Sequence, residues 1–366
     1  MEPVNAIELL GVTKRFGEVV ANDNVNLTVR KGEILSILGE NGSGKTTLMN
    51  MLSGIYFPDE GEIRVNGKTV TIRSPKDSFE LGIGMIHQHF KLINILTAAE
   101  NIILGLPGKE KLNMKQVEKE IRELTEQYGF DLNPSQKIYD MSVSQKQTVE
   151  IVKVLYRGAD ILILDEPTAV LTPQETEKLF AVLRNMRKAG KSIIIITHKL
   201  NEVLELSDRV AVLRKGKYID TVETAKATVE SLTEMMVGEK VKLDINRTEP
   251  VGAEKRIEMR GITCKNKEGL KVLTEASFTA YSGEILGVAG ISGSGQKELL
   301  ESVAGLQPIE SGEILYFSPE GTTEKISEMK AEDIKNLGIT LSFVPEDRLG
   351  MGLVGSMDLT DNMMLR

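Results

Sequence analysis

The chain has 366 residues, of which 41% are hydrophobic and 27% are charged. At roughly 150 residues per domain, this length predicts two domains or slightly more. The net charge of −8 excludes a general basic field that would attract nucleic acid or an anionic membrane surface. The single cysteine, Cys264, excludes an intramolecular disulfide and indicates a reducing compartment.

The first residues do not resemble a secretion signal, and no stretch approaches the run of about 18 apolar residues that a membrane span needs. We therefore expect a chain that is soluble and not exported by itself.

Short runs that are almost wholly apolar predict strands at residues 34–38, 161–164 and 193–196. Such runs are typical of parallel strands that helices cover on both faces. The sequence therefore predicts an α/β fold with a parallel-sheet core.

Two helices have clear ends in the sequence. One is predicted from Asn113 to just before Gly129, with four residues spaced to share one face, namely Val117, Ile121, Leu124 and Tyr128. The other is predicted to begin after Thr172, because Pro173 and Glu175 follow as in a capping box, and to end at Gly190.

The sequence repeats itself at a spacing of 251 residues. The segments 32–35, 39–44 and 61–63 recur in phase as 283–286, 290–295 and 312–314. We therefore expect two copies of one domain. The expected division is a first domain at 1–239, a polar linker at 240–254 and a shorter second copy at 255–366.

Residues 39–46, Gly-Glu-Asn-Gly-Ser-Gly-Lys-Thr, fit the phosphate-binding P-loop between a predicted strand and a helical segment. Glycines and the helix N-terminus present N–H groups to phosphate, Lys45 can reach the β and γ oxygens, and the Thr46 hydroxyl can ligate Mg²⁺. The predicted nucleotide-binding residues are Gly39, Asn41, Gly42, Ser43, Gly44, Lys45, Thr46 and Thr47. Thr47 stands where a dinucleotide-binding loop requires its third glycine, which disfavours a dehydrogenase.

Asp165 and Glu166 follow the second apolar run. A strand that ends in two carboxylates supplies the second part of the catalytic site of a nucleotide hydrolase. We expect Asp165 to hold Mg²⁺, directly or through water, and Glu166 to accept a proton from the attacking water.

Five features together resemble an ATP-binding cassette (ABC) ATPase. They are the P-loop, Gln88, residues 141–145 (Met-Ser-Val-Ser-Gln), residues 165–168 (Asp-Glu-Pro-Thr) and Thr197-His198, in that order and approximate spacing. The resemblance implies a P-loop cassette with a parallel-sheet core, a helical subdomain and an antiparallel β subdomain, followed by a partial second cassette. It also implies ATP and Mg²⁺ as ligands.

Further roles come from the resemblance alone. Gln88 would contact Mg²⁺ and the water and relay the nucleotide state to a membrane partner, while His198 would contact the γ-phosphate. Phe16 would stack on adenine, or could equally belong to the core. His87 and His89 are expected to be structural. The implied signature, which serves the opposite P-loop in cassette dimers, comprises Ser142, Val143, Ser144 and Gln145.

The tandem arrangement, with residues 168–175 in the first copy and residues 344–348 in the second, resembles the double-cassette ATPases of sugar and nucleoside importers. Residues 87–90 (His-Gln-His-Phe) and 100–102 (Glu-Asn-Ile) favour the nucleoside-uptake branch. The resemblance implies a peripheral subunit on the cytoplasmic face of the cell membrane. Its partners would be integral-membrane permease subunits and, indirectly, an extracytoplasmic solute-binding protein, with no nucleic acid. Two alternatives remain: a soluble cassette ATPase in translation or DNA repair, and a truncated nucleotide-binding remnant.

The second copy departs from the pattern. Gln296 and Lys297 replace the lysine and threonine of the first P-loop, and Glu346 replaces the glutamine. An amide cannot replace the ammonium, and a lysine cannot ligate Mg²⁺. We expect a degenerate second site that hydrolyses nucleotide poorly, comprising Gly290, Gly293, Gly295, Gln296 and Glu346.

The signature of the first copy is also altered, with Ser144 in place of the usual second glycine and Thr148 in place of a frequent arginine. In a cassette dimer it would face the altered P-loop at Gln296. The P-loop at Lys45 would need a signature that we expect beyond Arg366, in a cassette that is cut short here. We therefore expect slow hydrolysis unless another cassette or another copy supplies that signature.

Overall fold

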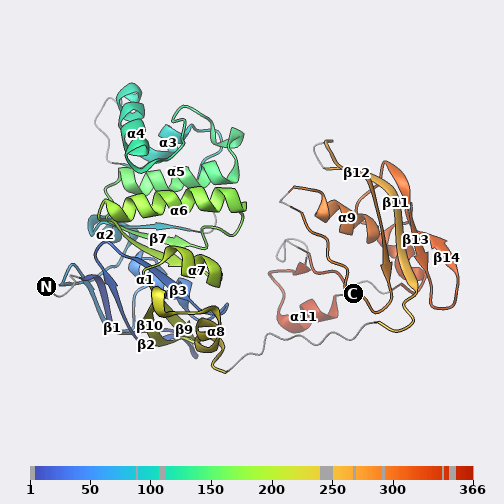
Figure 1. The fold of residues 1–366 in the computed structure, drawn as a ribbon, viewed down its shortest axis with the longest axis horizontal. Coiled ribbons are helices and arrows are strands. Elements are labelled where there is room, and N and C mark those ends of the chain that lie inside the picture. The colour runs from blue at the N-terminus through green and yellow to red at the C-terminus, as the bar shows by residue number, and fades with distance from the viewer. Residues whose placement is uncertain are drawn as a thin grey trace. The chain divides into compact units, whose positions relative to one another are not determined.

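The computed structural model describes residues 5–87, 90–106, 113–239, 250–266, 269–290, 293–339, 342–345 and 352–365. The chain divides into two compact units, Met1–Asp244 and Ile245–Arg366. Figure 1 labels most of their helices and strands. Most of the segment predicted as a linker, residues 240–249, lies outside the described residues.

The first unit contains both strands and helices. Its strands are β1 (Asn5–Phe16), β2 (Val19–Arg30), β3 (Ile34–Leu38), β4 (Glu60–Val65), β5 (Lys68–Val70), β6 (Ile83–Ile86), β7 (Ile161–Asp165), β8 (Ser192–Ile196), β9 (Arg209–Arg214) and β10 (Lys217–Glu223). Its α-helices are α1 (Lys45–Leu52), α2 (Pro75–Glu80), α3 (Ala98–Ile103), α4 (Met114–Tyr128), α5 (Val143–Tyr156), α6 (Pro173–Lys188), α7 (Leu200–Leu206) and α8 (Val229–Val237).

A six-stranded sheet forms the centre of this unit, in the order β10-β9-β3-β8-β7-β6. The five strands from β9 to β6 are parallel, and β10 pairs antiparallel with β9. In β7, Ile161 and Ile163 pack towards α1 and the antiparallel sheet, whereas Leu162 and Leu164 pack against α5 and α6. Both faces of the strand are therefore buried, which is why its sequence is apolar without alternation.

Two further parts flank the central sheet (Figure 1). An antiparallel sheet has the order β2-β1-β4-β5, and α3, α4 and α5 share a core of their own around Ile102, Ile121 and Val149. The predicted fold, with a parallel core, an antiparallel β part and a helical part, is confirmed.

The predicted helix ends are also observed. Asn113 caps α4 by accepting a hydrogen bond from the backbone of Gln116, and Gly129 ends the helix with φ of 83°. Thr172 forms a complete capping box with Glu175 at the start of α6, which ends at Lys188, slightly before the predicted Gly190.

The second unit contains β11 (Lys255–Lys265), β12 (Lys271–Tyr281), β13 (Ser311–Phe317), β14 (Thr323–Lys325), α9 (Gln296–Val303), α10 (Ala331–Asn336) and α11 (Leu359–Met364). Its sheet order, β12-β11-β13-β14, reproduces β2-β1-β4-β5 of the first unit. The repeat of β3, residues 285–289, is not a strand, and Ile285 is 98% exposed. A central parallel strand needs neighbours on both sides, and no described strand of this unit pairs with the segment.

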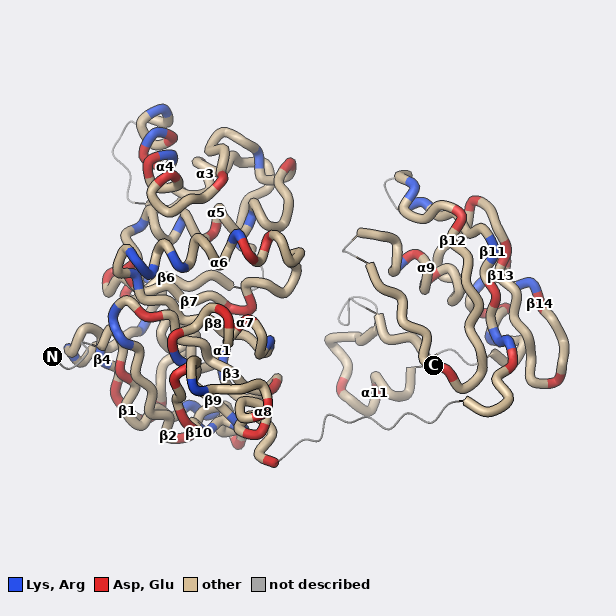
Figure 2. The backbone as a smooth tube through the Cα atoms, in the orientation of Figure 1, with Lys and Arg blue, Asp and Glu red and all other residues tan. Residues whose placement is uncertain are grey.

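Basic and acidic residues are interspersed along the described chain, as the colours in Figure 2 show. Any phosphate must therefore be held by local geometry. Within the described ranges, no helix is long and apolar enough to cross a membrane.

Candidate active site

The loop between β3 and α1 has the backbone shape of an anion-binding turn. Gly42 and Gly44 have φ angles of 79° and 93°, and Gly44 is the N-cap of α1. A Cβ at Gly44 would lie 2.4 Å from the carbonyl oxygen of Ala21, so this position has no room for a side chain. Leu48 donates to the Gly44 carbonyl at 2.9 Å as the helix begins, and the preceding amides point out of the helix towards the loop. Such a helix end attracts phosphate.

Lys45 is the first residue of α1, and its buried side chain reaches back to this loop. Its Nζ donates to the carbonyl oxygens of Gly39 at 2.7 Å and Glu40 at 2.8 Å. Burial lowers the pKa of the Lys45 ammonium, while the negative charges of Glu166 and Asp165 raise it. A cation held this way against backbone carbonyls is ready for an anionic ligand.

Thr46 and Asp165 meet beside the loop, where the Thr46 hydroxyl donates to Asp165 Oδ2 at 3.3 Å. Burial raises the pKa of the Asp165 carboxyl, and the hydrogen bond from Thr46 lowers it. Hydroxyl and carboxylate oxygens are the donors that Mg²⁺ prefers, and Mg²⁺ commonly takes few protein ligands beside substrate phosphates. The residues present therefore fit that ion.

Glu166 and His198 complete the cluster from the ends of β7 and β8. His198 Nδ1 lies 2.9 Å from Glu166 Oε1. Glu166 has a left-handed backbone, with φ of 46°, and its N–H donates to the carbonyl of Ile196 at 2.9 Å. Five sequence-predicted residues, Lys45, Thr46, Asp165, Glu166 and His198, are thus brought together.

Phe16 lies at the hairpin end of β1 and is 43% exposed. Tyr56 packs edge-on against it, with ring centroids 5.1 Å apart. In the adjacent strand β2, the Asn22 amide donates to the carbonyl of Gly44 at 3.2 Å, which ties this strand pair to the P-loop. Sequence reasoning missed Tyr56 and Asn22, because neither belongs to a motif and only the folded chain brings them to the site.

The remaining loop residues have different environments. Asn41 is exposed and Thr47 is half-buried on α1, whereas Ser43 is buried. Ser43 Oγ has no hydrogen-bond partner within the described chain.

Gln88 and His89 lie outside the described residues. His87 is half-buried, and burial lowers its pKa.

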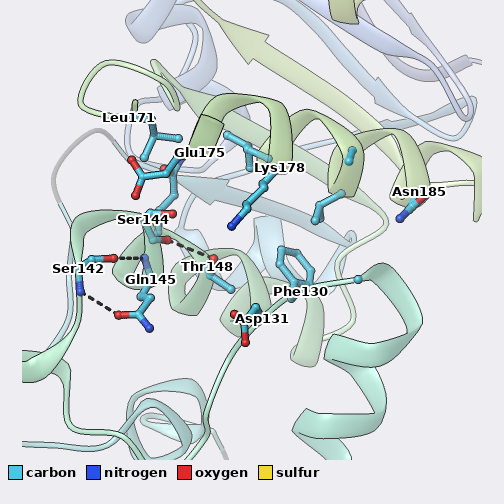
Figure 3. A pocket seen from close by; sticks show the side chains of 15 residues that line it. Phe130, Asp131, Ser142, Ser144, Gln145, Thr148, Leu171, Glu175, Lys178 and Asn185 are labelled. Carbon is cyan, nitrogen blue, oxygen red and sulfur yellow. Dashed lines mark hydrogen bonds between the residues drawn. The ribbon is translucent and has the colours of Figure 1, made fainter. Parts of the chain in front are cut away.

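The four signature residues lie at the start of α5, where Ser142 and Gln145 form a reciprocal capping box. Figure 3 shows the side chains of Ser142, Ser144 and Gln145 at one end of a pocket of about 660 Å³ that Phe130 and Lys178 also line. Ser144 accepts a hydrogen bond from Thr148 through its carbonyl, and Val143 is 43% exposed. No hydrogen bond between described residues joins this group to the P-loop of the same chain.

In the second unit, the described end of the corresponding loop keeps the positive φ angles of its glycines, and the chemistry beside it changes. Gly293 and Gly295 have φ angles of 81° and 89°, and Gly295 caps α9. A Cβ at Gly290 would lie 2.4 Å from Gln296 Nε2, so a neutral amide packs where the first unit has its ammonium. Lys297 is directed instead towards Glu301, 3.9 Å away along the helix. Glu346 lies outside the described residues.

The model of the ABC transporter family matches residues 22–169. The nucleoside import ATP-binding protein NupA of Lactococcus lactis subsp. cremoris is 45% identical over 98% of this chain and 70% of its own length. The guanosine import ATP-binding protein NupO of Bacillus subtilis is 44% identical over the same shares. The chain belongs to the ABC transporter family of ATP-binding proteins. As an ABC ATPase it binds ATP.

Solved structures agree with this assignment. A nucleotide-free ATP-binding cassette from an ABC transporter superposes with a TM-score of 0.55 at 26% identity, covering 64% of this chain and 96% of the other. A dimeric cassette in a post-hydrolysis state with ADP and Pi gives a TM-score of 0.53 at 28% identity, covering 60% and 98%. The ABC ATPase fold is therefore shared with proteins observed both without nucleotide and with its products.

Proposed function

We propose that this ABC ATPase hydrolyses Mg-ATP at the Lys45 site to energise import of a nucleoside through a membrane permease. The observation that supports this most strongly is the cluster around Lys45, in which the Thr46 hydroxyl bonds Asp165 and the Glu166 carboxylate lies against His198. A phosphate cradle, oxygen ligands for a cation and a candidate base are the parts that ATP hydrolysis requires.

Each residue in the cluster has a proposed task. Lys45 and the loop amides would hold the phosphates, and Thr46 and Asp165, with Gln88, would hold Mg²⁺. When bound, Mg²⁺ neutralises developing phosphate charge.

Glu166 would accept a proton from water, and His198 would orient that carboxylate and contact the γ-phosphate. Phe16 would stack on adenine, and the site would be completed by a signature from another cassette.

The substrate class rests on the relatives. Those named for nucleoside and guanosine import are 44–45% identical to this chain, against 40% for the glucose import ATP-binding protein TsgD13 of Haloferax volcanii. A ribose import ATP-binding protein, RbsA 1 of Rubrobacter xylanophilus, is 39% identical. A nucleoside is therefore favoured, and a simple sugar is the alternative.

An exposed apolar patch supports the permease as partner. Ile95 and Tyr139 are 73% and 61% exposed, and they are neighbours because the Tyr139 N–H donates to the Asn94 carbonyl at 3.2 Å. The buried amide of Asn101 holds the adjacent Ile93 backbone through two hydrogen bonds. A rigid apolar surface suits docking to a membrane protein, which would place the chain at the cytoplasmic face with a solute-binding protein as an indirect partner.

Uptake of labelled guanosine and labelled ribose tests the proposal, in cells that express this chain together with its permease. We expect guanosine uptake that Lys45→Ala removes. Uptake of ribose alone would replace the nucleoside assignment with a sugar. Uptake that is unaffected by Lys45→Ala would contradict the proposed site.

A further inference from the structure

A buried side chain of α5 contacts the loop that follows the proposed base. Gln147 is 4% exposed, and its Nε2 donates to the carbonyl oxygen of Pro167 at 2.7 Å. Pro167 is itself buried and directly follows Glu166. The bond therefore joins α5, the helix that begins at the signature, to the residue next to the carboxylate.

The backbone at Glu166 needs such support. Its φ of 46° lies in the left-handed region, which a residue with a side chain adopts only when its surroundings hold it there. Two backbone bonds contribute, from the Glu166 N–H to Ile196 and from the Ala169 N–H to the Glu166 carbonyl at 3.2 Å. Without Gln147, the Pro167 carbonyl would be a buried acceptor that has lost its partner.

The other side of the same loop is held by α7. The hydroxyl of Thr168 donates to Glu202 Oε2 at 2.5 Å, and Lys199 Nζ donates to the Thr168 carbonyl at 2.9 Å. The loop is thus clamped between two helices. In the described chain, only Gln147 provides a side-chain bond to the loop from the helix that carries the signature.

We propose that Gln147 is a positioning residue, which sets the place of the Glu166 carboxylate through Pro167 and makes it depend on the position of the signature helix. The proposal rests on the proposed role of Glu166 as base. A movement of α5 when its signature engages a nucleotide would be transmitted to Glu166 through this one hydrogen bond.

Hydrogen exchange tests the bond without requiring turnover. In Gln147→Leu, we expect amides of residues 166 and 168–171 to exchange at least tenfold faster than in the unmodified chain, with residues 193–196 unchanged. Gln116→Leu is the matched control, because its amide bonds Glu120 on an exposed helix face. Gln147→Asn, which withdraws the amide by one methylene group, should act in the same direction if the leucine variant does not fold. Unchanged exchange, or faster exchange throughout β7 and β8, overturns the proposal.

Kinetics separate positioning from general damage. We expect Gln147→Leu to lower kcat for ATP by about 10-fold to 100-fold, since small displacements of a catalytic group have effects of this size, with KM and nucleotide affinity unchanged. In a Glu166→Gln background, the same substitution should have no further effect on the residual rate. An additional loss there overturns action through Glu166. Full turnover in Glu166→Gln alone would instead refute the proposed base, and the exchange result would still decide the role of the bond.

Discussion

The ring of His198 and the carboxylate of Glu166 lie 2.9 Å apart although 32 positions separate them in the chain. The contact follows from strand pairing. β7 and β8 are adjacent and parallel, with Asp165 opposite Ile196, so both strands end at the same edge of the sheet. Residues just beyond each end therefore meet beside the P-loop, which precedes α1 at the end of β3.

Replacement of Glu166 by Gln should separate binding from hydrolysis. The amide keeps the size of the side chain but cannot accept the proton from water, so turnover should fall by about 100-fold or more. ATP affinity, measured by titration with a fluorescent ATP analogue, should stay within about twofold. A large loss of affinity would contradict the assignment of Glu166 as base.

Lys45→Ala and Gln296→Ala compare the two loops directly. Removal of the buried ammonium should weaken ATP binding roughly 10-fold to 100-fold, since a charged hydrogen bond contributes about 1.5–3 kcal/mol. Removal of the neutral Gln296 amide should leave the turnover of the chain unchanged. Calorimetric titration and a phosphate-release assay measure both effects. Turnover that depends on Gln296 and not on Lys45 would show that hydrolysis takes place at the second loop.

Asp165→Asn should stabilise the nucleotide-free chain and weaken its binding of Mg²⁺. Burial raises the pKa of Asp165 in the folded chain. The carboxyl therefore favours the folded state while it is protonated, below its unfolded pKa, and this contribution is lost as pH rises through the folded-state pKa. At pH 7 the ionised carboxylate therefore lowers the stability of the folded chain, and asparagine, which carries no charge, removes this effect. We expect Tm to rise at pH 7 by about 2–4 °C, the shift that about 1 kcal/mol produces in a domain of this size. The gain should disappear below about pH 4. A gain that persists at low pH would refute the desolvation argument.

Gly44→Ala and Gly42→Ala distinguish crowding from backbone strain. Both glycines have positive φ, but a Cβ at Gly44 would meet the Ala21 carbonyl and the Asn22 amide, whereas nothing lies within 4 Å of one at Gly42. We expect Gly42→Ala to lower the free energy of unfolding by about 1 kcal/mol, from strain alone, and Gly44→Ala to lower it by more. Urea unfolding measures the difference, and equal losses would contradict the packing seen here.

Much of the fold could be predicted because its signals are local. β3, β7 and β8 are almost wholly apolar since both faces are covered, and α4 and α6 have capping residues that act within one turn. Composition alone does not make a strand of residues 285–289, the repeat of β3, which are mostly apolar but are not a strand. Pairing decides whether such a segment is a strand, and the described second unit offers it no neighbour.

By itself, the sequence determined the P-loop, the carboxylate pair and the repeat, because glycine spacing, helix caps and apolar runs act over a few residues. Only the tertiary structure decided that Thr46 bonds Asp165, that Asn22 holds Gly44, and that Gln147 reaches Pro167. Each of these bonds joins segments at least 20 residues apart. The order of strands in the sheet and the packing of α5 decide which residues form these bonds, and neither can be read from the local sequence.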